Sequence, residues 1–127
     1  MQLTEYAERV RAQILQIPSV LFHSLAYEDR PPTAGLVKGS VTFSDGSRLH
    51  FREFLRLGEP IIRMKYAYHY VSASGGLLFR YDNALDPAAK HLASYPDHKH
   101  LPHSIVPSES PPLDQALREA AQHIKRH

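Results

Sequence analysis

Three successive segments of this chain alternate between apolar and polar residues. They cover residues 48–57, 61–72 and 77–82, and a turn-forming stretch separates each one from the next. Successive side chains of a β-strand point to opposite faces, so this period of two predicts antiparallel strands with one buried and one exposed face. A slip of one residue would exchange the two faces, so the pattern also constrains how the strands pair.

A further strand is expected over residues 34–43, joined to the strand at 48–57 by the sequence SDGS. Pairing Val41 with Leu49 keeps the apolar residues on one face. It requires a three-residue loop with Gly46 in the left-handed conformation. A two-residue Asp-Gly turn would pair Val41 with His50 and mix the faces. We therefore expect the bulged hairpin.

The apolar positions define the face expected to pack against helices. They are Leu49, Phe51, Leu55, Leu57, Ile62, Met64, Tyr66, Tyr68, Tyr70, Leu77, Phe79 and Tyr81. Glu53 is the exception, because it places a carboxylate among them. It is expected either to accept a hydrogen bond from a tyrosine or to mark a sheet edge.

The two ends of the chain have helical patterns. Residues 4–16 place apolar side chains at helical spacing, with Thr4 as candidate N-cap. Residues 111–126 do the same, with Ser110 as N-cap and Pro111 at the first helical position.

A strand over 19–28 and a loop over 29–35 complete the expected elements. The prediction is a single two-layer α+β domain over residues 1–127. A β-meander of about five strands, spanning residues 19–82, packs against the N- and C-terminal helices. A long loop rich in histidine and proline follows at 83–110.

Composition excludes several classes of function. The chain has no cysteine, which rules out disulfides, thiolate zinc sites and cysteine nucleophiles. Its apolar runs are shorter than a membrane span and its N-terminus lacks the apolar core of a signal peptide, so we expect a cytoplasmic protein with no membrane partner. The formal charge of +2 and the pI near 9.0 are compatible with a nucleic-acid partner without requiring one. No cofactor is expected.

The polar positions of the strands are mostly basic. The cationic or potentially cationic residues are Arg48, His50, Arg52, Arg56, Arg63, Lys65, His69 and Arg80, and Asp82 is the main acid among them. Such a face could bind the phosphates of a nucleic acid. The alternative is an ordinary solvated sheet face, since exposed strand positions are routinely Lys and Arg.

The segment FRYDNA, residues 79–84, ends the last alternating strand. Tyr81, Asp82 and Asn83 offer a phenol, a carboxylate and an amide at a point where a strand opens into a loop, a position suited to a functional group. Asp-Asn is also ordinary turn chemistry.

The stretch YPDHKHLPH, residues 95–103, concentrates imidazoles. In an extended segment His98 and His100 project to one side and Lys99 to the other. Such an H-x-H pair can ligate zinc if further ligands are near, and the available ones are Asp97, His91, His103 and Asp82. The same residue types suit metal-free RNA cleavage, which needs a base, an acid and a cation at the phosphate. A flexible loop with no specific role is the third reading.

The chain resembles the TumE-type family, small proteins identified as toxins of type II toxin–antitoxin systems. The resemblance runs from about Gly39 to Pro112. It is carried by GSVTFSDGSRLHFREF, RMKYAYHY, LLFRYDNA, YPDHKH and VPSESP. Where the family has "YDNAPHH" and "FPHHKH", this chain has YDNALDP and YPDHKH. Asp86, Pro87 and Asp97 therefore stand where the family has histidines.

The resemblance implies a toxin with a helix-turn-helix antitoxin as partner, and a homo-oligomer is a further expectation. Joined to the residue pattern, it gives the hypothesis of a metal-independent endoribonuclease. His98 and His100 would act as base and acid, Lys99 and Arg80 would stabilise the phosphate, and Asp82 would orient a histidine. The RNA backbone would lie on Arg48, His50, Arg52, Arg63, Lys65 and His69.

Two alternatives remain open at this point. One is a non-catalytic module that binds nucleic acid or protein. The other is a zinc protein with His98, His100 and an aspartate, Asp97 first among the candidates.

Overall fold

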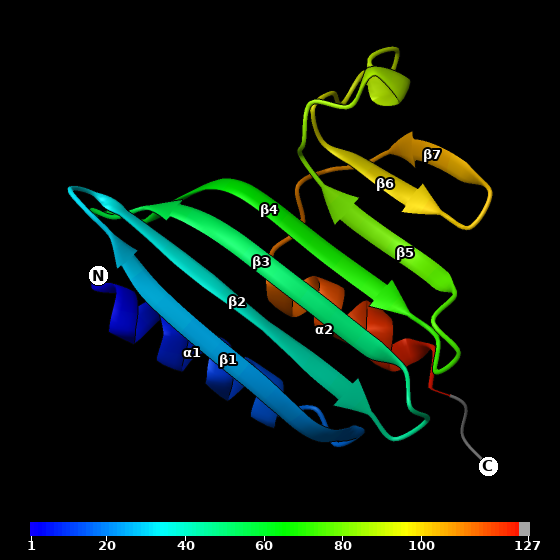
Figure 1. Ribbon diagram of the computed structural model, residues 1–127, viewed down its shortest axis with the longest axis horizontal. Helices are drawn as coiled ribbons and strands as arrows, with labels where there is room; N and C mark the ends of the chain where they lie inside the picture. The colour runs from blue at the N-terminus through cyan, green and yellow to red at the C-terminus, as the bar shows by residue number, and fades with distance from the viewer. Residues whose placement is uncertain (125–127) are drawn as a thin grey trace.

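The computed structural model describes residues 1–124 and shows two helices and a seven-stranded antiparallel sheet (Figure 1). The elements are α1 (Leu3–Leu15), β1 (Val20–Arg30), β2 (Ala34–Phe43), β3 (Arg48–Arg56), β4 (Ile62–Val71), β5 (Leu77–Asp82), the short 3₁₀ helix η1 (Pro87–Ala89), β6 (His98–Leu101), β7 (Ser104–Pro107) and α2 (Leu113–Gln122). Each strand pairs with the next in sequence, so the order across the sheet is β1 to β7.

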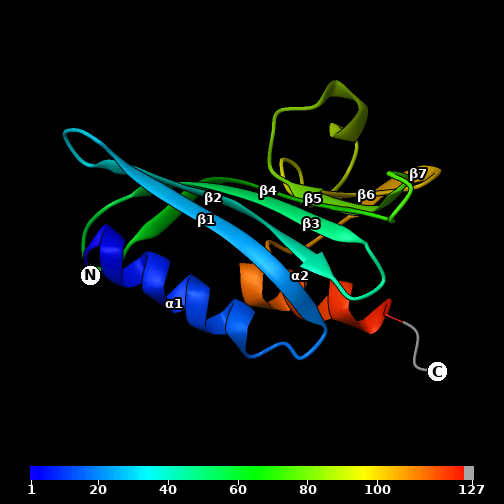
Figure 2. The same cartoon turned by 60° about the horizontal axis from the view of Figure 1, so that its bottom comes forward.

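Both helices cover the same face of the sheet, which confirms the predicted two-layer α+β architecture (Figure 2). The segment 83–97, which contains η1, rises on the opposite side of the sheet. The core lies between the helices and the sheet. Its largest fully buried side chains include Tyr68, Tyr70, Phe43, Phe79 and Ile14. We call the face that carries no helix the outer face.

The β2–β3 hairpin has the predicted register. Val41 pairs with Leu49, and Gly46 adopts a left-handed φ of +85° in the connecting loop. The alternation of apolar and polar residues therefore determined the pairing correctly at this point, because burial of one face leaves a single acceptable register.

Residues 98–107 form two short strands where the sequence predicted only loop. β6 pairs with β5 and β7 pairs with β6, which raises the strand count from about five to seven. Each of these strands has four residues. That length is too short for a recognisable alternation, and the prolines at positions 96, 102 and 107 lie at or beyond the strand ends. His98, Lys99 and His100 are thus held in a sheet.

The structure also corrects several element boundaries. β1 extends to Arg30, so the predicted loop at 29–35 is a short turn. Helix α1 has Gln2 as N-cap in place of Thr4. Helix α2 begins at Leu113 with Pro112 as N-cap and ends at Gln122, and positions 125 and 126 of the predicted helix lie outside the described residues. The carbonyls of the two residues predicted to start it, Ser110 and Pro111, accept hydrogen bonds from an arginine of β4.

That arginine is Arg63, which the alternation had placed on the outer face. A bulge in the β3–β4 pairing sets Arg63 opposite Leu55 and Lys65 opposite Phe54, so Met64 is the extra residue. The shift turns Arg63 toward the helices, where its guanidinium contacts the Tyr68 hydroxyl. Met64, predicted to be buried, is 45% exposed. The predicted membership of Arg63 in the basic face is therefore wrong.

Glu53 lies in the helix-covered interior and is 1% exposed. Its carboxylate accepts hydrogen bonds from the Tyr6 hydroxyl at 2.6 Å and the Tyr68 hydroxyl at 2.5 Å, with Arg63 4.0 Å away. The first of the two expectations for Glu53, a tyrosine partner, is confirmed. Because Tyr6 belongs to α1, this buried network ties the helix layer to the middle of the sheet.

Candidate functional site

The register of the sheet places outward-facing residues of five strands in a row. Across β2 to β6 the successive partners are Lys38, Arg52, Ala67, Asp82 and His98. Strands lie about 4.8 Å apart. Two cations therefore come from β2 and β3, a carboxylate and an imidazole come from β5 and β6, and a small alanine side chain separates the two pairs.

A second, parallel row lies next to the first. Its successive partners are Ser40, His50, His69, Arg80 and His100. The Arg80 Nη1 atom donates to His69 Nδ1 at 3.3 Å, and burial, followed by the positive charge of Arg80, lowers the pKa of His69. The two rows together put the predicted residues of the basic face and those of the YPDHKH segment on one surface.

A pocket of about 310 Å³ opens on the outer face between the two ends of the first row. Ala67 lies between Arg52 and Asp82, and its short side chain leaves the space between them free. The cationic residues that line the pocket are Arg30, Arg52, Lys65 and Arg80. Asp82 also lines it and pairs with His98 of β6, which does not. The pocket is thus basic on one side and adjoins an acid–imidazole cluster on the other.

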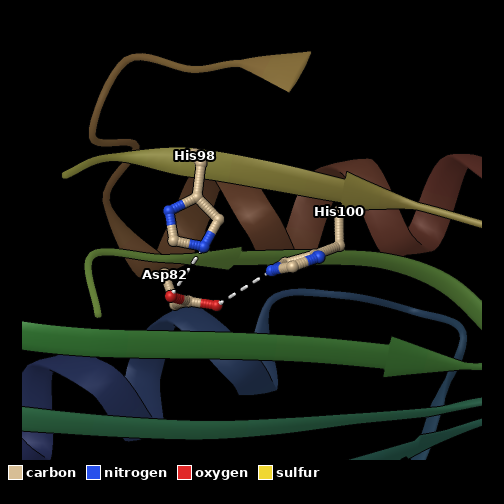
Figure 3. Close-up of side chains that lie close together, drawn as sticks. All are labelled: Asp82, His98 and His100. Carbon is tan, nitrogen blue, oxygen red and sulfur yellow. Dashed lines mark ion pairs between the residues drawn. The ribbon is translucent and has the colours of Figure 1, made fainter. Parts of the chain in front are cut away.

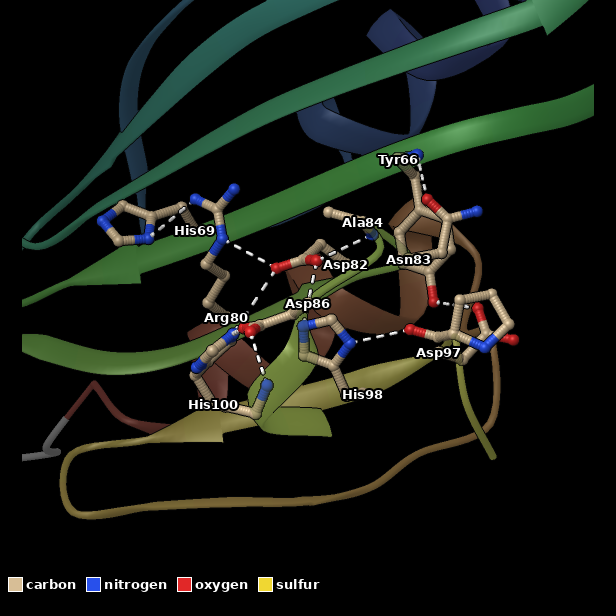
Figure 4. Close-up of polar contacts among 12 residues, drawn as sticks. Tyr66, His69, Arg80, Asp82, Asn83, Ala84, Asp86, Asp97, His98 and His100 are labelled. Atoms are coloured by element: carbon tan, nitrogen blue, oxygen red, sulfur yellow. Dashed lines mark hydrogen bonds and ion pairs between the residues drawn. The ribbon is translucent and has the colours of Figure 1, made fainter. Parts of the chain in front are cut away.

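Asp82 ends β5 and is 3% exposed. Its Oδ1 atom accepts a hydrogen bond from the Ala84 backbone N–H at 3.0 Å, and its Oδ2 atom accepts one from Arg80 Nε at 2.9 Å. These two bonds fix the carboxylate orientation (Figure 4). Asp82 therefore serves as a turn-forming residue, as its sequence context suggested, and also presents its remaining oxygen lone pairs to β6.

Two histidines of β6 face this carboxylate, and we call Asp82, His98 and His100 the Asp–His cluster (Figure 3). His98 Nε2 lies 3.1 Å from Asp82 Oδ1, and His100 Nε2 lies 3.8 Å from Asp82 Oδ2. The two imidazole rings meet edge to face with centroids 4.8 Å apart. The hypothesis that Asp82 orients a histidine is consistent with this arrangement.

The two histidines differ in their access to solvent. His98 is 0% exposed, and its Nδ1 atom bonds to the Pro96 carbonyl at 2.7 Å. A carbonyl oxygen only accepts, so Nδ1 carries the proton. The side chain of His100 is 23% exposed. Of these two residues, His100 is the one that a substrate on the outer face can touch.

The segment between β5 and β6 supplies a further carboxylate. Asp86 caps η1 by accepting a hydrogen bond from the Ala88 backbone N–H at 2.9 Å. Its Oδ2 atom lies 3.9 Å from His100 Nε2. The sequence marked Asp86 only as a departure from the family pattern, because its proximity to β6 depends on how residues 83–97 fold over the outer face.

Comparison with known proteins was informative at the level of the family. Residues 10–127 match the family described as toxin TumE. The chain belongs to the TumE toxin family. Searches of curated proteins and of solved structures gave no match.

The two motifs that carried the resemblance to TumE toxins meet in the structure. The YDNA motif ends β5 and the HKH motif forms most of β6, and the two strands pair directly, with Asp82 opposite His98. Asp86, which stands where the TumE family has a histidine, also reaches this cluster. Asp97, at another such position, accepts a hydrogen bond from the Tyr66 hydroxyl at 2.7 Å and lies outside the Asp–His cluster.

Lys99 lies on the opposite side of β6 from the two histidines, as the alternation predicted. Its Nζ atom pairs with Glu119 of α2 at 2.8 Å and lies 4.8 Å from the centre of the Tyr81 ring. The Tyr81 hydroxyl also donates to Glu119. The position of Lys99 on the helix-covered side does not fit the predicted role of stabilising a phosphate beside His98 and His100.

Asn83 has a structural contact in this TumE protein. Its side-chain oxygen accepts from the Tyr66 backbone N–H and its side-chain nitrogen donates to the Met64 carbonyl, each at 3.1 Å. These bonds continue the β4–β5 pairing beyond the last residue of β5. Asn83 therefore positions the strand end that carries Asp82.

The outer face is richer in cations than the sequence indicated. Arg30 joins it because β1 extends further than predicted, and Lys38 joins it because the β2–β3 register places it opposite Arg52. Arg30 pairs with Glu28 and Arg80 pairs with Asp82. Five other cations of this face make no ion pair with any residue in 1–124: Lys38, Arg48, Arg52, Arg56 and Lys65. No helix in that range is long and apolar enough to cross a membrane.

Proposed function

We propose that this TumE-family protein is the toxin of a toxin–antitoxin pair and acts on RNA as an endoribonuclease. The observation that carries the proposal is the junction of the basic pocket with the Asp–His cluster on the outer face. Family membership supports a toxin, and this junction supports a phosphodiester as the group acted upon. A helix-turn-helix antitoxin is the expected partner.

Binding of RNA would rest on the cations that lack an acidic partner. Arg52 and Lys65 line the pocket, and Arg48 and Lys38 lie on the same face beside it. A cation already paired with a carboxylate gains less from a phosphate, because the phosphate must displace its partner. Neutralising phosphates releases condensed counterions, so affinity for RNA should fall steeply with salt.

Cleavage would take place where the pocket meets the Asp–His cluster. Attack of the ribose 2′-hydroxyl on the phosphorus atom requires removal of its proton, protonation of the leaving 5′-oxygen and stabilisation of the charged phosphorane. Arg80 suits the last of these tasks, because it lines the pocket and its pairing with Asp82 engages only Nε, which leaves Nη2 available to a phosphate. His100, the imidazole that can contact the RNA, would take the proton of the 2′-hydroxyl, and the leaving 5′-oxygen would receive its proton from water.

His98 would not contact RNA, because its side chain is fully buried. It would act as a positioning residue for Asp82, which in turn lies between both histidines. The sequence-based assignment of His98 and His100 as a base–acid pair is therefore replaced by one accessible histidine, supported by Asp82 and a buried second histidine.

The proposal is tested by controlled expression of the toxin in bacteria, with growth and total RNA integrity as readouts. Wild-type protein should arrest growth and fragment RNA, and co-expression of the adjacent antitoxin gene should restore both. Asp82→Asn keeps the turn, because the amide oxygen can still accept from Ala84. The Asp82→Asn substitution should weaken both growth arrest and RNA fragmentation by at least about 100-fold, the usual scale for loss of a proton-transfer or electrostatic group.

Asp114→Asn is the matched control. It makes the same chemical change on α2, on the other side of the molecule, where Asp114 pairs with Arg118. This variant should remain as toxic as the wild type. Growth arrest with intact RNA, or equal toxicity of the two variants, would contradict the proposal. RNA binding without turnover would favour the non-catalytic module.

A further inference from the structure

The buried His98 side chain has an unpaired nitrogen that points into the Asp–His cluster. Its Nδ1–H is committed to the Pro96 carbonyl, so the neutral ring has a lone pair at Nε2. That atom is fully buried and makes no hydrogen bond to any group in residues 1–124. Buried polar atoms nearly always have a partner, so this one requires an explanation.

The nearest polar atom is also an acceptor. Asp82 Oδ1 lies 3.1 Å from His98 Nε2, yet the two are not aligned for a hydrogen bond. Two lone pairs in such contact repel each other unless a positive species lies between them. A metal ion placed to one side of the line between the two atoms would supply that positive charge and would bind both atoms without the alignment that a hydrogen bond needs.

The third residue of the Asp–His cluster is placed to complete a coordination sphere. One ligand atom each from Asp82, His98 and His100 lie within 4.8 Å of one another. Zinc binds histidine nitrogen and carboxylate oxygen at about 2.0–2.1 Å, which puts tetrahedral ligands about 3.3 Å apart. The observed separations, 3.1 Å from His98 to Asp82 Oδ1 and 3.8 Å from His100 to Asp82 Oδ2, are close to this value for the two carboxylate oxygens in turn. The widest separation in the cluster, 4.8 Å, would have to shorten by roughly 1.5 Å, and partly exposed His100 is the residue that can move.

The groups behind these ligands have the arrangement found around protein-bound metals. A metal-binding histidine usually donates its other ring N–H to a carbonyl or carboxylate, as His98 does to Pro96. The Asp82 carboxylate is itself fixed by the Ala84 N–H and Arg80. Asp86, 3.9 Å from His100, adds a second negative charge that outweighs the single guanidinium. A divalent cation therefore enters a region of net negative charge.

We propose that Asp82, His98 and His100 bind one divalent transition-metal ion, with zinc as the reference ion. Two imidazoles and one carboxylate favour zinc and its neighbours over magnesium or calcium, which prefer all-oxygen sites. Three protein ligands leave a fourth position free, on the side where His100 reaches the outer face. Asp97 has no part in this site, because it lies outside the cluster and bonds to Tyr66.

The proposed metal site stands on this geometry and does not depend on RNA cleavage. Metal binding would nevertheless affect the proposed function in one definite way. Coordination occupies the Nε2 lone pair of His100, so the metal-bound protein cannot use that atom for proton transfer. A metal would also replace the metal-independent chemistry expected from the sequence.

The test is a direct measurement of metal binding by untagged, chelator-treated protein. Isothermal titration with zinc chloride should show one zinc ion per chain, and cobalt(II) should give a visible absorption band that zinc displaces. His100→Ala and Asp82→Asn should each weaken zinc binding by at least about 100-fold, the upper end of what loss of a supporting group alone costs. Both variants should keep the wild-type circular dichroism spectrum, since His100 is partly exposed and Asn preserves the turn.

His103→Ala is the matched control for His100→Ala. His103 is an exposed histidine in the β6–β7 turn, three residues away and outside the cluster. Its replacement should leave zinc affinity within about twofold. Absence of saturable zinc binding by the wild type would overturn the proposal. So would binding that survives in both cluster variants, or that is lost equally in His103→Ala. Each of these results concerns the metal alone and is obtained whether or not the protein cleaves RNA.

Discussion

Replacement of Tyr6 by phenylalanine tests the account of how the helix layer is attached to the sheet. The Tyr6 hydroxyl donates to the buried Glu53 carboxylate at 2.6 Å, across 47 residues of sequence. Phenylalanine keeps the ring and removes the donor. Glu53 then retains the Tyr68 hydroxyl as hydrogen-bond donor, with Arg63 nearby.

The size of the effect follows from the charge on the acceptor. Hydrogen bonds to charged groups contribute about 1.5–3 kcal/mol, and partial exposure of Tyr6 places this one near the lower end, at about 1.5–2 kcal/mol. An unfolding entropy of about 2.1 cal/mol/K per residue corresponds to about 0.27 kcal/mol/K for this chain. Tyr6→Phe should therefore lower the Tm by about 6–7 °C.

The assay is urea unfolding followed by circular dichroism, together with a thermal melt. Tyr27→Phe is the matched control, because Tyr27 lies on β1, is 43% exposed and has no side-chain hydrogen bond within residues 1–124. The control should change the free energy of unfolding by less than about 0.5 kcal/mol. If Tyr6→Phe is no more destabilising than Tyr27→Phe, the proposed role of the Glu53 network is refuted.

Three further outcomes follow from other parts of the molecule. Gly39→Ala should destabilise the fold by about 1–3 kcal/mol in urea unfolding, because the added Cβ would overlap the Ser24 carbonyl, and unchanged stability would contradict that packing. Replacing Arg52 and Lys65 together by alanine should lower the slope of log affinity against log salt for single-stranded RNA by about 1.4, roughly 0.7 per phosphate contact. Arg118→Ala on α2 should leave that slope unchanged, and equal slopes for all three proteins would count against the outer face. The free energy of unfolding should keep its full value below about pH 10 and fall as the pH rises further. The reason is that the tyrosines of the unfolded chain ionise in this range, while those of the folded chain stay protonated. Burial raises the pKa of each tyrosine concerned, namely Tyr6, Tyr66, Tyr68, Tyr70 and Tyr81. A free energy of unfolding that stays constant from about pH 9 to 11.5 would refute this prediction.

The central strands were predictable because one face of them is buried along most of their length. Burial of one face imposes a period of two, and that period also selected the Val41–Leu49 pairing and the left-handed Gly46. The same argument failed at Met64. The bulge puts the residues before it on the opposite face from the one that the alternation predicts. Ile62 and Met64 are apolar and continue the alternation, so the sequence gives no sign of this change. Hydrogen bonds from Arg63 to carbonyls just before α2 stabilise the reversed arrangement, and those are distant in sequence.

The residue types of the candidate site were predictable from the sequence, but the contacts among these residues were not. Period two places Asp82 on one side of β5 and separates His98 and His100 from Lys99 on β6. What brings the carboxylate opposite His98 is the pairing of β5 with β6 across the intervening segment 83–97. A four-residue strand gives no pattern from which such a register could be read. The burial of His98 and the approach of Asp86 depend on that same segment, so neither could be predicted.

The most direct test of the central claim, that the outer face cleaves RNA at the Asp–His cluster, is cleavage of a 5′-labelled RNA by purified protein. Wild type, His100→Ala and His103→Ala are compared under single-turnover conditions at equal concentration. The account predicts that the wild type and His103→Ala cleave at rates within about twofold, and that His100→Ala is slower by at least about 100-fold. An intact RNA with the wild type, or equal rates for all three proteins, would contradict it.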